Sequence, residues 1–454
     1  MVCTDYTIFL VVFKLPKNMV FFMSKFPYYF SCCNPQMWES DFVKLANGGR
    51  VSQNGLSEFC EQKDLQNRVA LGIYTKTHAT LIPQGFETVR LVRYALLDAA
   101  QKLLPRERIK SCLRCRIDKT KDVSVKYNVS TKKAHYGNLQ RCGSVWCCPN
   151  CAPKITEQRK NEVKQAVERH KGGLYMLTLT IPHYMGDNLK LLLLAFRGAL
   201  KRFFSGTRKA KAIWADMGKI GHIKALEVTW GQNGWHPHYH ILIFTEKELP
   251  QNYNTAPLVE LWQNCCRLAK LPIPSLKYGL DFRKGEYSEY VTKWGWSIES
   301  EMTKGHLKNG RGSNWSAWDL LKYYAFGGGD DVEKYGKLFQ EFAICFKGSR
   351  QLDWSRGLKS MFGIGEKTDE QIADETQQNA EDVYDLNREF WRLICKYQRK
   401  ADFLYCIEYD QENGSYIALE FLEMLAKFEY QKILNSASLS VAYLRNEHGQ
   451  TCTI

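Results

Sequence analysis

The chain has 454 residues, a formal net charge of +15 and a sequence pI of about 9.0. Hydrophobic residues make up 44% and charged residues 24%, which is typical of globular proteins and excludes a wholly disordered or collagen-like chain. A chain of this length usually forms about two or three domains. The positive charge favours a polyanionic partner, either nucleic acid or an anionic surface.

The charge is distributed unevenly along the chain. Residues 361–454 contain 9 basic and 17 acidic residues, so the first 360 residues carry all of the positive excess. We therefore expect a polyanion to bind before residue 361 and the remainder to be an acidic, helical region. No apolar run reaches the roughly 20 residues of a membrane-spanning helix, so the sequence predicts no membrane partner.

The first predicted elements are helical. Apolar residues at helical spacing predict helices at 86–103 and 155–170. Between them, residues 104–126 are strongly basic, and a second basic cluster follows at 201–211. We expect both clusters to contact phosphate groups, although a solvated surface is the alternative for each.

Cysteines are concentrated in one segment. Six of the 16 lie between Cys112 and Cys151, and no secretory signal is visible, so we expect a cytoplasmic protein without disulfides. The pairs Cys112-Leu-Arg-Cys115 and Cys148-Pro-Asn-Cys151 each have the spacing of half a zinc site. Two such pairs would form a closed, structural Zn²⁺ site; free buried or reactive thiols are the alternative.

The pattern then changes from helix to strand. Residues 174–181 form a short β-branched and apolar run that predicts a strand, and 187–205 predicts the next helix. Two alternating runs at 223–230 and 236–244 predict strands. The Gly-Gln-Asn-Gly sequence at 231–234 predicts that these two strands form a hairpin.

Helical patterns dominate the rest of the chain, at 257–269, at 286–296 and after residue 317. Strands interleaved with helices, with one clear hairpin, predict an α+β fold with an antiparallel sheet.

Three histidines, His236, His238 and His240, lie on the second strand of the predicted hairpin. Alternate residues of a strand share a face, so His238 and His240 can direct two imidazoles at one ion. Glu227 on the facing strand can complete the set. Two histidines and a carboxylate hold a divalent cation and leave positions open for substrate. A His-rich solvent face is the alternative.

A helix at 286–296 would place Glu286, Tyr290 and Lys293 on one side. A tyrosine, with a pKa of about 10, is a poor nucleophile at neutral pH. It becomes competent beside a cation that polarises its phosphate target and a lysine that stabilises the phenolate. Alone, such residues more often serve packing and solvation. Tyr287, one turn away, is a rival nucleophile.

Together these motifs resemble the HUH endonuclease superfamily. HPHYHILIF at 236–244 is similar to its paired-histidine motif, and YVTK at 290–293 is similar to its nucleophile motif. LTLTIPH at 177–183 resembles the first motif of plasmid and phage-type rolling-circle replication initiators. The likeness extends to the cysteine-rich segment 134–155 and to 348–375.

The resemblance implies a chemistry for these residues. A Mg²⁺ or Mn²⁺ ion on His238, His240 and Glu227 would polarise the scissile phosphate. Tyr290 would attack it, which leaves a 5′-phosphotyrosyl link and a free 3′-OH.

Further roles follow from the same likeness. Glu286, four residues before the tyrosine, matches one plasmid branch in which this glutamate activates water in the closing step. Lys293 would neutralise charge on the phenolate or phosphate. For the zinc, the likeness favours Cys142, Cys148 and Cys151 with one upstream ligand, Cys115 rather than Cys112.

The implied organisation has four parts. These are an N-terminal extension at 1–85, a basic and cysteine-rich zinc-binding segment at 86–155, an HUH endonuclease core at 156–360 and an acidic helical region at 361–454. The core would be a central antiparallel sheet flanked by helices. The implied partners are origin DNA, as a single strand or hairpin, and a host polymerase and helicase in a bacterial cytoplasm.

Two alternative functions remain open. An HUH-type single-strand transposase would use the same chemistry, and some carry a cysteine-rich segment. A non-catalytic zinc-containing DNA-binding protein would require the histidine strand and Tyr290 to be structural.

Overall fold

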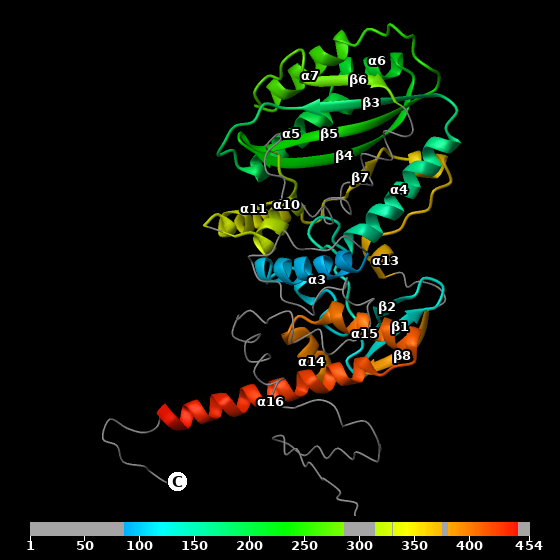
Figure 1. The fold of residues 1–454 in the computed structure, drawn as a ribbon. Helices are drawn as coiled ribbons and strands as arrows, with labels where there is room; N and C mark the ends of the chain where they lie inside the picture. The colour runs from blue at the N-terminus through cyan, green and yellow to red at the C-terminus, as the bar shows by residue number, and fades with distance from the viewer. Residues whose placement is uncertain (1–85, 286–313, 329, 375–379, 444–454) are drawn as a thin grey trace, which may run out of the picture. The chain divides into compact units, whose positions relative to one another are not determined.

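The computed structural model describes residues 86–285, 314–328, 330–374 and 380–443. Within these residues the chain forms two antiparallel sheets with helices around them, which confirms the predicted α+β class (Figure 1). No helix in the described ranges is long and apolar enough to span a membrane.

The larger sheet has five strands in the order β6-β3-β5-β4-β7. The strands are β3 (Gly173–Thr180), β4 (Lys219–Gly231), β5 (Gly234–Thr245), β6 (Leu280–Lys284) and β7 (Leu352–Trp354). The three predicted strands lie at β3, β4 and β5, and the predicted hairpin is the β4–β5 pair. The edge strands β6 and β7 are short and were not predicted.

One face of this sheet is covered by helices α5 (Leu189–Lys201), α6 (Arg208–Asp216) and α7 (Ala256–Leu268). Ile241 and Ile243 of β5 are fully buried there, together with Trp262 of α7. The helix predicted at 187–205 ends as a π-helical turn, Arg202–Gly206, which joins α5 to α6.

The opposite face is covered only in part. Helix α4 (Ala152–Arg169) packs Val163 and Ala166 against Leu242 and Phe244 at one end of β5. The other end of the same face carries the paired histidines. Figure 1 shows α4 leading from the cysteine-rich region towards β3.

The smaller sheet has the order β2-β1-β8, with β1 at Val123–Asn128, β2 at Lys133–Tyr136 and β8 at Ala380–Leu386. Strand β8 pairs along the whole of β1, although the two are more than 250 residues apart. The cysteine-rich segment and the acidic C-terminal region therefore share one sheet. The C-terminal region is mainly helical, as expected, apart from β8.

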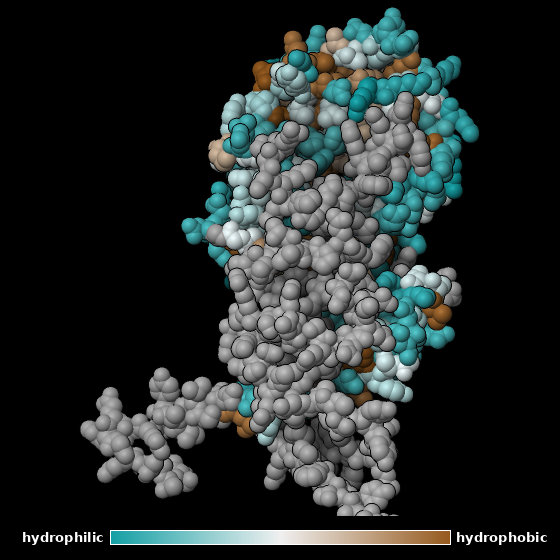
Figure 2. Space-filling model, in the orientation of Figure 1, coloured by the Kyte–Doolittle hydropathy of each residue, from teal (hydrophilic) through white to brown (hydrophobic). Residues whose placement is uncertain are grey.

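Most of the remaining helices pack around the smaller sheet or join the two sheets, and α12 packs against β4 of the larger sheet. They are α3 (Phe86–Leu103), the 3₁₀ turn η2 (Arg108–Ser111), α10 (Ala317–Phe326), α11 (Val332–Cys345), α12 (Leu358–Met361), α13 (Asp369–Asp374), α14 (Arg388–Lys396), α15 (Lys400–Asn413) and α16 (Ile417–Tyr443). Figure 2 shows mostly hydrophilic residues on the visible described surface, with smaller hydrophobic areas near α6 and α7.

A buried ion pair joins helix α15 of the C-terminal region to helix α3. Lys400 at the start of α15 lies 2.9 Å from Asp98 of α3, and the two side chains are only 2% and 11% exposed. The backbone carbonyl of Lys400 also accepts a hydrogen bond from the Tyr136 hydroxyl on β2, at 2.7 Å. Residues 302 positions apart in the sequence thus depend on each other for charge compensation.

Replacing Lys400 with Met should lower the free energy of unfolding by about 3 kcal/mol, because it leaves the Asp98 carboxylate buried without its cation. Adding Asp98→Asn should recover part of the loss. Urea denaturation measures both effects, with Lys427→Met on the exposed surface of α16 as the control. Equal transition midpoints for Lys400→Met and the control would show that the pair does not stabilise the fold.

Candidate functional site

The β4–β5 register brings the predicted cation ligands together. Glu227 lies directly opposite His238, and His240 lies two residues further along β5 on the same face. The Nε2 atoms of His238 and His240 are 3.0 Å and 3.2 Å from the same oxygen of Glu227. One ligand atom from each of the three residues lies within 4.8 Å of the others. The predicted trio therefore forms one cluster.

The turn of the hairpin is held against the loop that follows β3. Gly234 has a φ of 82°, in the left-handed region that glycine enters without strain. A Cβ at this position would lie only 2.9 Å from the carbonyl oxygen of Tyr184. His183 Nδ1 lies 3.0 Å from the carbonyl oxygen of Asn233 in the turn. These contacts fix the end of the hairpin that carries the histidines.

Thr178 on β3 is a site residue that sequence reasoning missed. Its hydroxyl lies 3.3 Å from His240 Nδ1, and it faces His240 across the β3–β5 pairing. A partner on Nδ1 fixes the orientation of the imidazole, so that Nε2 faces Glu227. The signal was present, because Thr178 and Thr180 alternate within the motif at 177–183 and so share a strand face.

The electrostatics of the cluster suit a cation. Partial burial acts to raise the pKa of Glu227, but hydrogen bonds and positive charge from His238 and His240 lower it by more, well below the usual range. The Glu227 side chain is 53% exposed, whereas the two histidines are 15% and 13% exposed. An ionised carboxylate and two imidazole nitrogens that converge on open space match the donor set of a divalent ion.

His236 lies beside the cluster but outside it. Its ring centroid is 5.3 Å from that of His238 and 4.6 Å from that of His183. Burial, together with repulsion from these two histidines, lowers the pKa of His236 to about 4. Its imidazole is therefore neutral at pH 7.

The predicted nucleophile region lies outside the described residues. This applies to Tyr290, Tyr287, Glu286 and Lys293. The described residues on either side of this region both join the larger sheet. The amide of Gly285 donates to Leu174 O at 3.0 Å, and Trp315 exchanges two backbone hydrogen bonds with Trp230 at 2.7 Å and 2.8 Å.

Four cysteines form a second cluster. Cys112 Sγ lies 3.6 Å from Cys148 Sγ and 3.7 Å from Cys151 Sγ, and Cys142 Sγ lies 3.9 Å from Cys151 Sγ. Four sulfurs about 2.3 Å from a tetrahedral zinc would be about 3.8 Å apart. All four cysteines are buried. Their geometry therefore fits a closed zinc site.

The structure does not bring Cys115, the upstream ligand favoured by the family likeness, into this cluster. Cys115 is exposed and does not belong to the cluster, whereas Cys112 does. The reason is local: Gln101 of α3 donates hydrogen bonds to the carbonyl oxygens of Ile109 and Cys112, at 3.0 Å and 2.8 Å. These bonds hold the end of η2 so that Cys112, rather than Cys115, lies among the other sulfurs. Cys147 is buried beside Ser144 and is not a member either.

Burial raises the pKa of Cys148, while hydrogen bonds from Cys112, Cys142 and Cys148 hold the pKa of Cys151 well below its usual range. Thiolates are the zinc-binding form of cysteine. Cys151 occupies the N-cap position of α4, so the cluster is attached to the helix that covers part of the larger sheet.

Comparison with known proteins places the chain in a family. A family model described as "Replication protein" matches residues 135–405, which is more than half of the chain. The chain therefore belongs to the replication protein family. This assignment confirms the resemblance to plasmid-type Rep proteins that the motifs predicted.

Individual relatives agree. "Protein rep" from Streptomyces lividans is 28% identical over 50% of this chain and 64% of its own length. "Protein rep" from Lentilactobacillus hilgardii is 29% identical over 29% of this chain and 43% of its length. "Neomycin resistance protein" from Streptomyces cyanogenus is 30% identical over 23% of this chain and 30% of its own length. The chain thus spans less than two thirds of these relatives. No solved structure is significantly similar to it.

Zinc content should separate the two upstream cysteines. Cys112→Ser should lose bound zinc, because it removes one of four sulfurs at ligand distance, whereas Cys115→Ser should retain about one zinc per chain. Metal analysis of the purified proteins measures this. The opposite pattern, with zinc lost only in Cys115→Ser, would overturn the ligand set.

Glu227→Gln should weaken Mn²⁺ binding by at least about tenfold. Loss of a residue that only hydrogen-bonds to a metal ligand already costs about 10- to 100-fold in metal affinity, and Glu227 is expected to be a ligand itself. The matched control is Asp353→Asn, which removes a carboxylate from the other face of the same sheet, where it pairs with Lys224. Titration of zinc-loaded protein with Mn²⁺, followed by electron paramagnetic resonance, measures the affinity. Equal affinity in both variants would exclude Glu227 as a ligand.

Proposed function

We propose that this protein initiates rolling-circle replication of a plasmid by nicking one DNA strand at an origin. The observation that carries the proposal is the convergence of His238, His240 and Glu227 at the open end of a sheet face. Membership of the replication protein family supports the biological role. The HUH-type chemistry is the mechanism that fits this donor set and the motif order.

The trio would hold a Mg²⁺ or Mn²⁺ ion, which when bound polarises a phosphate and stabilises the negative charge that develops on it. The residues of the site have separate roles. His238, His240 and Glu227 supply the ligand atoms, and Thr178 keeps the His240 ring oriented. The 53% exposure of the Glu227 side chain leaves room for a DNA strand to approach.

Tyr290 is the proposed nucleophile, as the motif resemblance implies. Tyr290 Oη would bond to phosphorus as the bond from phosphorus to the 3′ oxygen breaks. The phenol loses its proton and the 3′ oxygen gains one.

Two further residues complete the proposed cycle. Lys293 would neutralise charge on the phenolate or the phosphate during attack. Glu286 would act as a general base for water in the closing step, which releases the protein after one round. The 3′-OH would prime a host polymerase, and a host helicase would separate the strands. The origin DNA would be bound as a single strand or hairpin.

The cysteine cluster would hold a structural Zn²⁺. Four thiolates leave no coordination position open for a substrate. The ion would fix the start of α4, and α4 covers the end of the sheet face next to the histidines. Its role is therefore to position the nuclease face.

The two alternatives differ from this proposal in separate ways. A single-strand transposase would share the chemistry, and the family assignment favours replication. A DNA-binding protein without catalysis would share the zinc site but form no covalent adduct.

The test uses labelled single-stranded DNA fragments tiled across the replicon that encodes the chain. With Mn²⁺ the wild-type protein should form a covalent adduct with one fragment, visible on a denaturing gel, and EDTA should abolish it. Tyr290→Phe should lose the adduct by at least about a thousandfold, because no other group replaces its oxygen. Tyr287→Phe is the matched control and should retain it.

Each other outcome is informative. An adduct that survives in Tyr290→Phe and disappears in Tyr287→Phe would transfer the nucleophile to Tyr287. A wild-type protein that binds the fragments but forms no adduct on any of them would contradict the nickase.

A further inference from the structure

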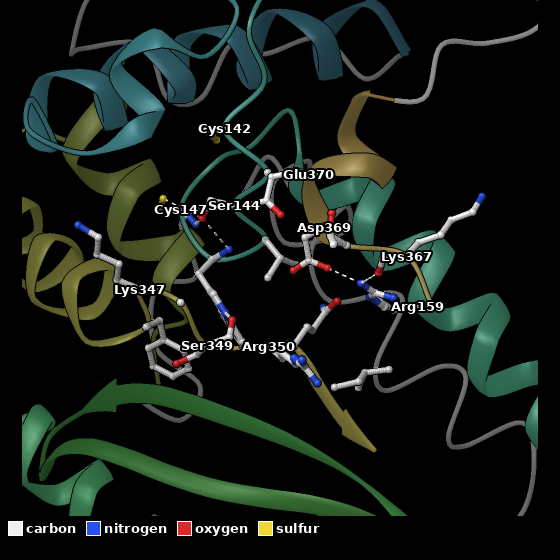
Figure 3. Close-up of a pocket in the computed structure, with 18 of the residues that line it drawn as sticks. Cys142, Ser144, Cys147, Arg159, Lys347, Ser349, Arg350, Lys367, Asp369 and Glu370 are labelled. Carbon is white, nitrogen blue, oxygen red and sulfur yellow. Dashed lines mark hydrogen bonds and ion pairs between the residues drawn. The ribbon is translucent and has the colours of Figure 1, made fainter. Parts of the chain in front are cut away.

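A pocket of about 740 Å³ lies between the cysteine-rich segment and the β7 edge of the larger sheet (Figure 3). Gly143 to Cys147 form one wall, the loop Lys347 to Leu352 a second, and Arg159 with the segment Glu366 to Glu370 a third. We call this cavity the β7 pocket. Its volume is within the range of cavities that enclose most of a ligand.

The β7 pocket and the histidine cluster share one face of the sheet. Leu352, which lines the pocket, is paired with Ala225 of β4, and Ala225 is in turn opposite His240. Directly opposed residues of antiparallel strands project from the same face. Glu227 lies two residues along β4 from Ala225, so its backbone is about 8 Å from that of Leu352. A chain that leaves the cluster along this face meets the pocket next.

The lining of the β7 pocket has an excess of positive charge, with seven basic and four acidic residues. Several of the basic residues are already compensated: Arg108 pairs with Glu370 at 2.7 Å, and Lys347 pairs with Glu107 at 2.8 Å. Arg159 likewise pairs with Asp369, at 2.6 Å.

Two arginines of the lining are different. Arg350 and Arg356 are exposed, and the described part of the chain supplies no carboxylate within ion-pair distance of either. Figure 3 shows Arg350 between the loop that carries Ser349 and the wall that carries Arg159. These two guanidinium groups are the ones available to an anionic ligand.

Two tryptophans also line this pocket. Trp354 is partly exposed in the lining, and its indole Nε1–H is buried with no hydrogen-bond acceptor among the described residues. Trp146 donates its own Nε1–H to Ser349 O at 2.7 Å, which holds the loop of Arg350 against the pocket. A positively charged groove lined by aromatic side chains is common among proteins that bind single strands.

We propose that the β7 pocket binds the single-stranded DNA that continues from the scissile phosphate. Arg350 and Arg356 contact its phosphates, and a base packs against the exposed part of Trp354. The inference rests on the proposed function only for the identity of the strand. It extends that function by assigning a path to DNA beyond the histidine cluster.

The test measures binding of fluorescein-labelled oligothymidylate of twelve residues by anisotropy, in EDTA, so that no cleavage chemistry is involved. The Arg350→Ala/Arg356→Ala double variant should bind about tenfold more weakly than wild type. The slope of log affinity against log salt should become shallower by about 1.4, since each lost single-strand phosphate contact contributes about 0.7. Arg388→Ala, an exposed arginine on α14 outside the pocket, should change neither quantity.

A second measurement locates the strand directly. The same oligonucleotide with one 5-bromouracil should photocrosslink to the peptide that carries Trp354 or Trp146, as identified by mass spectrometry. Affinity and salt slope within twofold of wild type in the double variant, with crosslinks only elsewhere, would overturn the proposal. Zinc content and the unfolding midpoint of the double variant should match wild type, so that weaker binding is not a loss of fold.

These outcomes are independent of the nickase test. If the wild-type protein forms no covalent adduct but the double variant binds DNA more weakly, the β7 pocket proposal stands and the nickase proposal is contradicted. If the wild-type protein forms the adduct but the double variant binds DNA as well as wild type, the nickase proposal stands and the β7 pocket proposal is contradicted.

Discussion

The register between β4 and β5 determines which side chains meet on the open face of the larger sheet. Because side chains alternate along a strand, a slip of one residue would move His238 and His240 to the opposite face. Burial prevents this slip: Tyr239, Ile241 and Ile243 lie under α5, α6 and α7. Fully burying each aliphatic side chain contributes about 1.5–3 kcal/mol. The hydrophobic packing on one face thereby positions the polar site on the other.

The hairpin and its cation ligands could be predicted because their signals are local. Period-two alternation, a glycine turn and the position of Glu227 opposite His238 all lie within about twenty residues of sequence. Strand β8 could not be predicted in the same way, because its partner β1 is more than 250 residues away and only tertiary packing selects it. The choice of Cys112 over Cys115 depended on hydrogen bonds from Gln101, which spacing does not encode.

Helix α4 connects the cysteine cluster to the larger sheet. It begins directly after Cys151 of the sulfur cluster and ends at Arg169, shortly before β3, with Val163 and Ala166 packed on the sheet. Arg159 on the same helix lines the β7 pocket and pairs with Asp369. A structural zinc would therefore fix the first turn of α4. The same helix packs on the sheet face and contributes Arg159 to the pocket wall. The acidic C-terminal region stabilises the same assembly through β8 and Lys400.

The central claim is that His238, His240 and Glu227 bind one divalent cation. The most direct measurement is a crystal structure of the zinc-loaded protein soaked with Mn²⁺, with anomalous scattering used to locate the manganese. We expect one manganese within about 2.0–2.3 Å of Nε2 of both histidines and of a Glu227 oxygen. Manganese bound elsewhere, or its absence from this cluster at saturating concentration, would contradict the site and the chemistry built on it.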